Sequence, residues 1–127
     1  MLSPTFTLLY VDSPKASADF YADLLGRKPV EASPTFAMFA LDNGQMLGLW
    51  SRHTVTPGAT AAGGGGELGF PVENDAKVDS LCADWKNRGL KIAQEPTRLD
   101  FGRTFVALDP DGHRLRVFAP GADEKAV

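Results

Sequence analysis

The segment FTLLYVDSPKASADFYADLLG, residues Phe6–Gly26, decides the fold, because an apolar run and a helical pattern follow each other within it. Phe6–Val11 consists largely of residues that favour strands. Ser13 is expected to cap the helix that follows, Pro14 suits its first turn, and Gly26 is expected to end it. The segment therefore predicts a strand and then a helix.

The rest of the first half predicts three more strands, and the second half repeats the whole order. The first-half strands are expected at Lys28–Ala32, Thr35–Leu41 and Gln45–Ser51. In the second half, a helix capped by Asn74 or Asp75 and ended by Gly89 follows the first strand. The second-half strands are expected at Glu67–Val72, Lys91–Gln94, Arg103–Leu108 and His113–Ala119.

Two βαβββ modules joined by a linker are therefore expected. The modules comprise residues 1–53 and 67–120, and a flexible Gly-rich linker, residues 54–66, joins them. Residues 121–127 are expected to form a frayed tail. Each module has one helix to cover one face of its sheet, so the predicted fold is α+β. Both sheets are expected to form one concave cup around a shared pocket, in a single structural domain.

Composition narrows the classes of function. The chain has 127 residues and a net charge of −3, which argues against a nucleic-acid surface. No apolar run reaches membrane-spanning length, and the start of the chain does not resemble a signal peptide. The chain has a single cysteine, Cys82, so it has no internal disulfide, and this favours a reducing compartment and a cytoplasmic location. Cys82 itself is expected to be a core residue.

Two motifs resemble those of a known family. The first half contains Leu9-Tyr10-Val11-Asp12, followed by Phe20-Tyr21, Leu24 and Gly26, and the second half contains the turn Asp109-Pro110-Asp111-Gly112-His113 before its last strand. They resemble the first module and the closing turn of the vicinal oxygen chelate superfamily, which includes glyoxalase I, extradiol dioxygenases and bleomycin-resistance proteins. Two further segments of this chain, Trp50-Ser51 and Phe101–Phe105, most resemble the members that bind an antibiotic without a metal, which are the phenazine- and bleomycin-resistance proteins. Because this fold carries many activities, function depends on the site.

The resemblance implies four inward positions at which metal-dependent members place His, Glu or Gln ligands. In this chain they are Phe6, Gly48, Glu67 and Arg116. Only Glu67 offers a metal ligand, whereas a catalytic site needs about three, so neither a metal nor another cofactor is expected. The first and fourth strands of a module lie together in this fold, which predicts an ion pair between Glu67 and Arg116. The pair either closes the former metal site or also meets a polar group of a ligand.

Strand alternation extends this inward surface. The candidate ligand-binding residues are Phe6, Leu8, Tyr10, Met46, Gly48, Trp50, Glu67, Arg116 and Phe118. Phe101 and Arg103 are further candidates, because the segment Phe101-Gly102-Arg103 just before a strand forms either the rim of a pocket or an ordinary turn. The third strand of the first half adds either Phe36 and Met38 or Ala37 and Phe39, because a one-residue slip reverses the faces. Trp50 is expected either to stack on a ligand, above a gap left by Gly48, or to seal the core or a dimer contact.

Three functions are compatible with these residues. The first is metal-independent binding of a planar aromatic small molecule by a homodimer, with no catalytic residues and with the resistance role that the resemblance implies. The alternative is a metal-dependent glyoxalase- or dioxygenase-type lyase or isomerase, which needs Glu67 together with His53 or His113. The third is a cofactor-free enzyme with Glu67 as general base, which a neighbouring arginine disfavours by lowering the pKa of the carboxyl.

Overall fold

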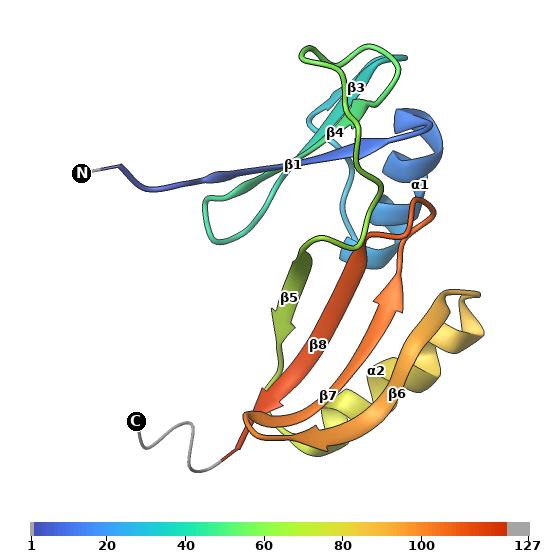
Figure 1. Ribbon diagram of the computed structural model, residues 1–127. Helices are drawn as coiled ribbons and strands as arrows, with labels where there is room; N and C mark the ends of the chain where they lie inside the picture. The colour runs from blue at the N-terminus through green and yellow to red at the C-terminus, as the bar shows by residue number, and fades with distance from the viewer. Residues whose placement is uncertain (1, 122–127) are drawn as a thin grey trace. The chain divides into compact units, whose positions relative to one another are not determined.

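Two units make up the part of the chain that the computed structural model describes, residues 2–121, and they divide between residues 62 and 63. Each unit has the order strand, helix and three strands, as predicted (Figure 1). The first unit contains β1 Phe6–Val11, α1 Pro14–Leu25, β2 Glu31–Ala32, β3 Phe36–Ala40 and β4 Met46–Ser51. The second contains β5 Glu67–Pro71, α2 Asp75–Asn87, β6 Lys91–Leu99, β7 Gly102–Leu108 and β8 Arg114–Pro120. The tail expected beyond residue 121 lies outside the described residues.

The two sheets share one strand order. It is β1-β4-β3-β2 in the first unit and β5-β8-β7-β6 in the second. The first and fourth strands of each unit run parallel, and the other neighbours are antiparallel. Side chains opposite one another in paired strands point to the same face, so the register assigns each residue to a face. One face of each sheet packs against the helix of its own unit (Figure 1).

Both helices begin at side-chain caps. The Ser13 hydroxyl accepts a hydrogen bond from the backbone N–H of Ala16 at 3.1 Å, as predicted for the start of α1. Of the two candidate caps for α2, the structure uses Asn74, whose Oδ1 accepts from the N–H of Lys77 at 2.8 Å. At the other end of α1, Gly26 has a φ of 66°, a left-handed conformation that glycine adopts without steric cost.

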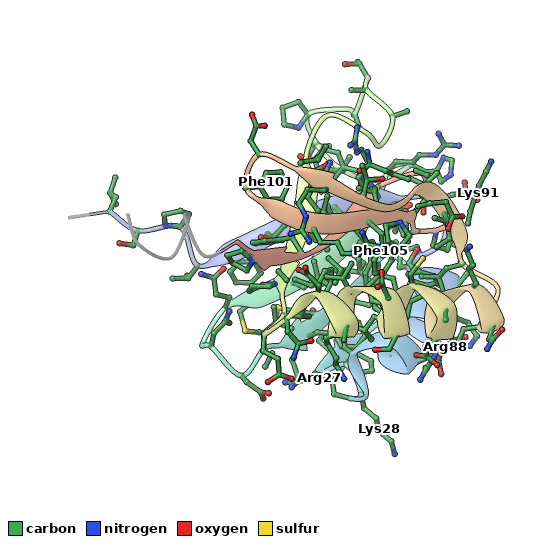
Figure 2. All side chains as sticks on the ribbon, turned by 90° about the horizontal axis from the view of Figure 1, so that it is seen from below. Arg27, Lys28, Arg88, Lys91, Phe101 and Phe105 are labelled. Carbon is green, nitrogen blue, oxygen red and sulfur yellow. The ribbon has the colours of Figure 1, made fainter. Side chains whose placement is uncertain are left out.

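Apolar side chains fill the space between each sheet and its helix. In the first unit, Tyr21 and Phe39 are fully buried. In the second unit, the Trp85 ring of α2 meets the Phe105 ring edge-on, with centroids 5.3 Å apart. Phe105 lies between sheet and helix (Figure 2). Cys82 is buried, as predicted for a core residue, and burial raises the pKa of its thiol.

Two strands differ in length from their predictions, and proline is involved in both. The strand expected at Lys28–Ala32 is reduced to the two residues of β2, because Pro29 has no N–H to donate to a neighbouring strand. The strand expected to end at Gln94 continues to Leu99 in β6. Pro96 is accommodated because β6 is an edge strand whose pairing with β7 shifts register between Gln94 and Thr97.

The segment expected as a linker, residues 54–66, is packed at both ends. Val55 is 5% exposed, and its N–H donates to the Ser51 carbonyl at 3.0 Å. A Cβ atom at Gly63 would lie 2.7 Å from the backbone nitrogen of His113, so only glycine allows this approach to the turn before β8. None of the helices within residues 2–121 has the length and apolar character needed to cross a membrane.

Replacing Gly102 by alanine is expected to destabilise the second unit. Gly102 has a φ of 139°, and an added Cβ would lie 2.0 Å from the carbonyl oxygen of Ala119 on the neighbouring strand. Backbone strain of this kind costs about 1–3 kcal/mol, so urea unfolding of Gly102→Ala should show a loss of at least about 2 kcal/mol. Gly66→Ala is the control, because an added Cβ there meets nothing within 4 Å. Equal stability of the two variants would contradict the strain.

Candidate functional site

The face of the first sheet that points away from α1 is rich in exposed apolar side chains. We call this surface the aromatic face; its residues are Phe6, Leu8, Tyr10, Phe36 and Trp50. On the edge strand β1, Phe6, Leu8 and Tyr10 remain 50%, 43% and 41% exposed. The register of β3 settles the choice between its two faces. Phe36 and Met38 lie opposite Trp50 and Gly48, whereas Ala37 and Phe39 are buried on the helix side.

A hollow of about 560 Å³ opens on the aromatic face. Phe6, Leu8, Glu31, Phe36 and Trp50 line it. The Phe36 and Trp50 rings meet edge-on, with centroids 6.2 Å apart and planes at 88°. This volume lies within the range of small-molecule sites, about 300–1,000 Å³. The hollow therefore combines a suitable size with two aromatic rings held at right angles.

The gap expected under Trp50 at Gly48 is filled. A Cβ atom at Gly48 would lie 2.5 Å from Leu8 Cδ2 and 3.1 Å from Phe36 Cζ. Glycine at this position therefore allows the Leu8 and Phe36 side chains to close over the backbone of β4. Gly48 forms the floor of the aromatic face, and its neighbours, rather than an open space, lie beside the Trp50 ring.

On the second unit, the face away from α2 carries a polar group of side chains, which we call the Glu67 cluster: Glu67, Arg114, Arg116, Gln94 and Thr104. Arg116 donates to both carboxylate oxygens of Glu67, from Nε at 2.7 Å and from Nη2 at 2.9 Å. Its Nη1 also donates to the Thr104 hydroxyl at 3.2 Å. The predicted ion pair therefore forms, in the bidentate geometry that gives arginine–carboxylate pairs their strength.

Arg114 also belongs to this cluster, although it was not among the candidate ligand-binding residues. It lies directly opposite Glu67 in the β5–β8 pairing, and Arg116 lies diagonally across. The Nη2 atom of Arg114 is 2.8 Å from Glu67 Oε2. The sequence did contain the signal for this contact, because Arg114 and Arg116 are two residues apart on one strand and share a face.

The two arginines determine the chemistry of Glu67. The pKa of its carboxyl is lowered from the ordinary value of 4.5, mainly because Arg116 donates hydrogen bonds to the carboxylate, while partial burial opposes the shift. A carboxylate that is stabilised in its charged form and engaged through both oxygens is a weak general base. The geometry therefore does not favour a cofactor-free enzyme based on Glu67.

Three further candidates lie near one end of the second sheet, but on different faces. The rings of Phe101 and Phe118 meet edge-on, with centroids 6.0 Å apart, so these two residues lie together. Arg103 does not join them or Arg116. It is paired with Ala119 in the register, on the helix side, and its Nε donates to Asp79 of α2 at 2.8 Å. Arg103 and Arg116 therefore occupy opposite faces of one sheet, and a role of Arg103 at the rim of a pocket stays a prediction.

The two histidines are explained by local contacts. His53 Nε2 lies 2.7 Å from the Asp12 carboxylate at the end of β1, and this hydrogen bond is the main cause that lowers the pKa of Asp12. The backbone N–H of His113 donates to Asp109 Oδ1 at 2.9 Å within the turn before β8. Among residues 2–121, no group of three or more His, Cys, Asp and Glu side chains is arranged to hold a metal ion.

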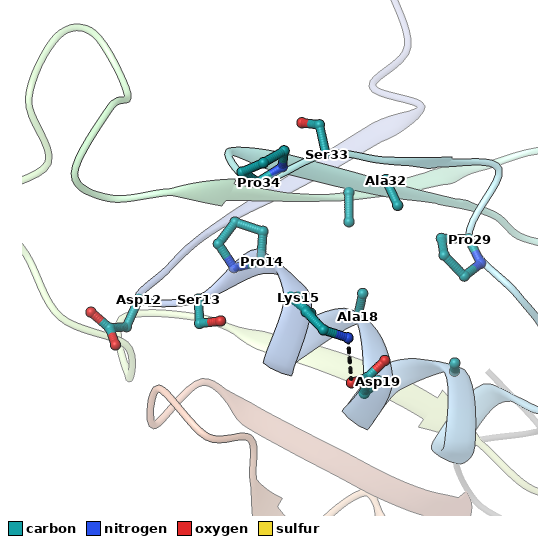
Figure 3. A pocket seen from close by; sticks show the side chains of 12 residues that line it. Asp12, Ser13, Pro14, Lys15, Ala18, Asp19, Pro29, Ala32, Ser33 and Pro34 are labelled. Carbon is teal, nitrogen blue, oxygen red and sulfur yellow. Dashed lines mark ion pairs between the residues drawn. The ribbon is translucent and has the colours of Figure 1, made fainter.

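A second hollow, of about 640 Å³, lies in the first unit between α1 and the chain around β2 (Figure 3). Pro14 and Ala18 of the helix side face Pro34 and Ala32 across it. Of the residues considered for ligand binding, it is lined by Ala37, the alternative that the register of β3 places on the helix side. It is larger than the hollow on the aromatic face, but its lining contains no aromatic side chain on which a flat ligand could stack.

Comparison with known proteins identifies the family. The sequence profile of the Glyoxalase/Bleomycin resistance protein/Dioxygenase superfamily matches residues 4–117. The chain belongs to this superfamily. It is also 31% identical over 119 residues to the phenazine antibiotic resistance protein EhpR of Enterobacter agglomerans, and the match covers 91% of each chain. The resemblance inferred from the sequence motifs is confirmed.

Solved structures of other proteins have the same fold. An Agrobacterium tumefaciens protein determined by NMR in solution is 59% identical, with a TM-score of 0.89 over 96% of this chain and 100% of that one. A glyoxalase-related enzyme from Fulvimarina pelagi is 22% identical, with a TM-score of 0.81 over 97% of this chain and 95% of that one. The second likeness concerns the fold alone.

The four positions at which metal-dependent members of the superfamily hold their ion do not suit a metal in this chain. Phe6 has no donor atom, and Gly48 has no side chain. Both oxygens of Glu67 accept from arginines. Arg116 carries a permanent positive charge and offers only donors. This set supplies at most one ligand for a divalent ion, whereas a catalytic zinc site uses about three protein ligands.

The Glu67 cluster predicts a pH dependence of stability. A carboxyl whose pKa is lower in the folded state stabilises the fold above its ordinary pKa, and this contribution is lost as the pH falls through the folded pKa. Between about pH 7 and pH 3, the wild type should lose about 1 kcal/mol more free energy of unfolding than Glu67→Gln, the upper range for a partly exposed ion pair. Urea titrations at several pH values would measure this difference.

The matched control for this experiment is Glu73→Gln, which removes an exposed carboxylate just after β5. Its pH profile should follow that of the wild type. Identical profiles for Glu67→Gln and the wild type would contradict a stabilising role of the cluster.

Proposed function

We propose that this protein binds a planar aromatic small molecule on the aromatic face, without a metal ion. The observation that carries the proposal is the hollow of about 560 Å³ whose lining includes the edge-to-face rings of Phe36 and Trp50. Offset and edge-on contacts between aromatic rings contribute about 0.5–1.5 kcal/mol beyond the burial of area. A flat ligand therefore gains both stacking energy and burial of apolar surface at this place.

The exposure of the aromatic face supports the same proposal. Large apolar side chains that remain 41–50% exposed on one strand leave a contiguous apolar surface in water. Such patches on a folded protein mark ligand or partner sites. Among residues 2–121, the one charged residue that lines the hollow is Glu31, on the edge strand β2. The lining therefore suits a ligand with a large apolar ring system better than a strongly charged one.

The residues at the four superfamily metal positions support binding rather than metal-assisted chemistry. They contribute an aromatic ring, a bare backbone and an arginine–glutamate pair, which together do not form a coordination shell. We therefore propose that the chain is a binding member of a superfamily that also contains enzymes.

The relative named a phenazine antibiotic resistance protein suggests what the binding achieves. Phenazines are planar aromatic molecules, which is the ligand class that the aromatic face favours. We propose that the protein sequesters such an antibiotic in the cytoplasm and in this way confers resistance. Sequestration requires no chemical step, only an affinity high enough to lower the free concentration of the antibiotic.

Trp50→Leu is expected to weaken the binding of phenazine at least about tenfold, corresponding to about 1.4 kcal/mol. Leucine keeps the position apolar but removes the ring that stacks, so the loss reports on stacking rather than on folding. Isothermal titration calorimetry would measure the dissociation constants. Phe20→Leu is the matched control, because Phe20 lies on α1 and does not line the hollow.

The same variants test the resistance role in cells. Expression of the wild type in a susceptible bacterium should raise the inhibitory concentration of phenazine, Phe20→Leu should preserve the effect, and Trp50→Leu should remove it. Equal binding of phenazine by Trp50→Leu and the wild type would overturn the assignment of the aromatic face as the site. Failure of the wild type to bind any planar aromatic compound would overturn the proposed function.

We also propose that the protein acts as a homodimer that pairs through the edge strand β1. This strand is six residues long, lies at the edge of its sheet and contains no proline or lysine, which are common protections of free edges.

Sedimentation velocity should show twice the chain mass. Tyr10→Lys, on this edge, should yield monomers, whereas Val30→Lys, beside the opposite edge, should remain dimeric. A monomeric wild type would contradict the proposal.

A further inference from the structure

The hollow between α1 and the chain around β2, which we call the helix-side hollow, marks a place where the first unit is packed less fully than the second. The strand register identifies the corresponding positions. Ala37 pairs with Leu49, the fourth residue of β4, and Phe105 pairs with Val117, the fourth residue of β8. Both Ala37 and Phe105 are buried. Where the second unit places a phenyl ring between sheet and helix, the first unit therefore places only a methyl group.

The helix wall of the hollow differs from its counterpart in the same sense. Ala18 is the fifth residue of α1, and the fifth residue of α2 is Asp79. In the second unit, Asp79 accepts a hydrogen bond from Arg103 Nε at 2.8 Å, which joins the helix to the sheet. The methyl group of Ala18 cannot form such a bridge. The space between α1 and the chain around β2 therefore stays open as a hollow of about 640 Å³ (Figure 3).

The walls of the helix-side hollow are held apart by rigid chain. Pro14 lies in the first turn of α1, and Pro29 and Pro34 flank β2, so each of these lining residues has a fixed φ. The N–H of Val30 donates to the Met38 carbonyl at 2.7 Å, which ties the chain around β2 to β3. An apolar space that cannot close forfeits dispersion contacts along its lining, and a molecule that fills it restores them.

The charged groups at the edge of this hollow are already paired. Asp19 lies 3.5 Å from Lys15 Nζ, and both belong to the lining (Figure 3). Asp12 lies 2.7 Å from His53 Nε2 and 3.5 Å from an Nη atom of Arg52. The lining otherwise consists mainly of alanine and proline. A charged ligand would lose hydration here without gaining an unpaired partner, whereas a neutral apolar one loses little.

We propose that the helix-side hollow binds a compact, neutral alicyclic molecule, whose carbon skeleton lies between Ala18 and Ala37. The ligand takes the place that the Phe105 ring fills in the second unit. The volume of about 640 Å³ lies within the range of small-molecule sites, about 300–1,000 Å³. A lining of methyl groups and pyrrolidine rings gains most from a bulky aliphatic body, because it offers no flat surface for stacking.

This site goes beyond the proposed function. It lies on the helix side of the first sheet, whereas Trp50 lies on the opposite face, and it favours a bulky ligand rather than a planar one. Binding at the helix-side hollow and binding on the aromatic face can therefore be measured separately.

The probe for the wild type is camphor, a compact neutral alicyclic ketone. In methyl-resolved NMR spectra, the signals of Ala18, Ala32 and Ala37 should shift saturably on addition of camphor, and the Trp50 indole signal should stay in place. Camphorsulfonate has the same carbon skeleton and a negative charge. It should bind at least about tenfold more weakly, because the charges at the edge of the hollow are already paired.

Ala32→Phe is expected to fill the hollow and to weaken the binding of camphor at least about tenfold. Ala32 lines the hollow and is exposed on the short strand β2, opposite Ala37, so a larger side chain can enter from the solvent side without displacing the core. Ala16→Phe is the matched control, because Ala16 is exposed on α1 outside the lining. It should bind camphor like the wild type in calorimetric titrations.

Three results would overturn the helix-side site. They are unshifted alanine methyl signals at millimolar camphor, equal affinity of Ala32→Phe and the wild type, and equal affinity for camphor and camphorsulfonate. A response of the Trp50 indole without any response of the alanines would place camphor on the aromatic face and would also overturn the site. None of these results bears on the binding of phenazine, which Trp50→Leu tests independently.

Discussion

Each unit of this protein has two sheet faces and only one helix, and most of the remaining organisation follows from this constraint. The helix covers one face and buries Phe39 in the first unit and Phe105 in the second. Strand alternation then places every second residue on the uncovered face. The face away from the helix carries most of the candidate ligand-binding residues, because its side chains are not required for the core of the unit. The parallel pairing of first and fourth strands aligns these residues in adjacent rows.

The two units use the uncovered face differently although they share one strand order. The first face is aromatic, and of the described residues around its hollow one, Glu31, is charged. The second is organised by Glu67 and two arginines. The difference is chemical rather than architectural, since the register that places Gly48 opposite Leu8 also places Gly69 opposite Arg116. The two units of the duplicated scaffold therefore carry surfaces of distinct chemistry, one aromatic and one charged.

Much of this structure could be predicted from the sequence, because the signals were local. The cap Ser13 and the terminal Gly26 predicted the two ends of α1, and the alternation of side chains along strands predicted that Phe6 and Trp50 share one face. The errors arose where a non-local pairing decided the outcome. Nothing near Pro96 indicates that β6 continues past it, because the register shift against β7 permits this. The face of Arg103 could not be predicted for a similar reason, since it is set by pairing with Ala119 in β8.

The close approach at Gly48 has an evolutionary consequence. A metal ligand at this position has to be a side chain, and even the first atom of that side chain would collide with Leu8 and crowd Phe36. A histidine or glutamate there becomes tolerable only after both neighbours have been reduced in size, and it gains nothing while Phe6 and Arg116 occupy the other positions. Single substitutions toward a metal site therefore carry a cost without a benefit, and this packing is a barrier to the evolution of metal-dependent catalysis from this chain.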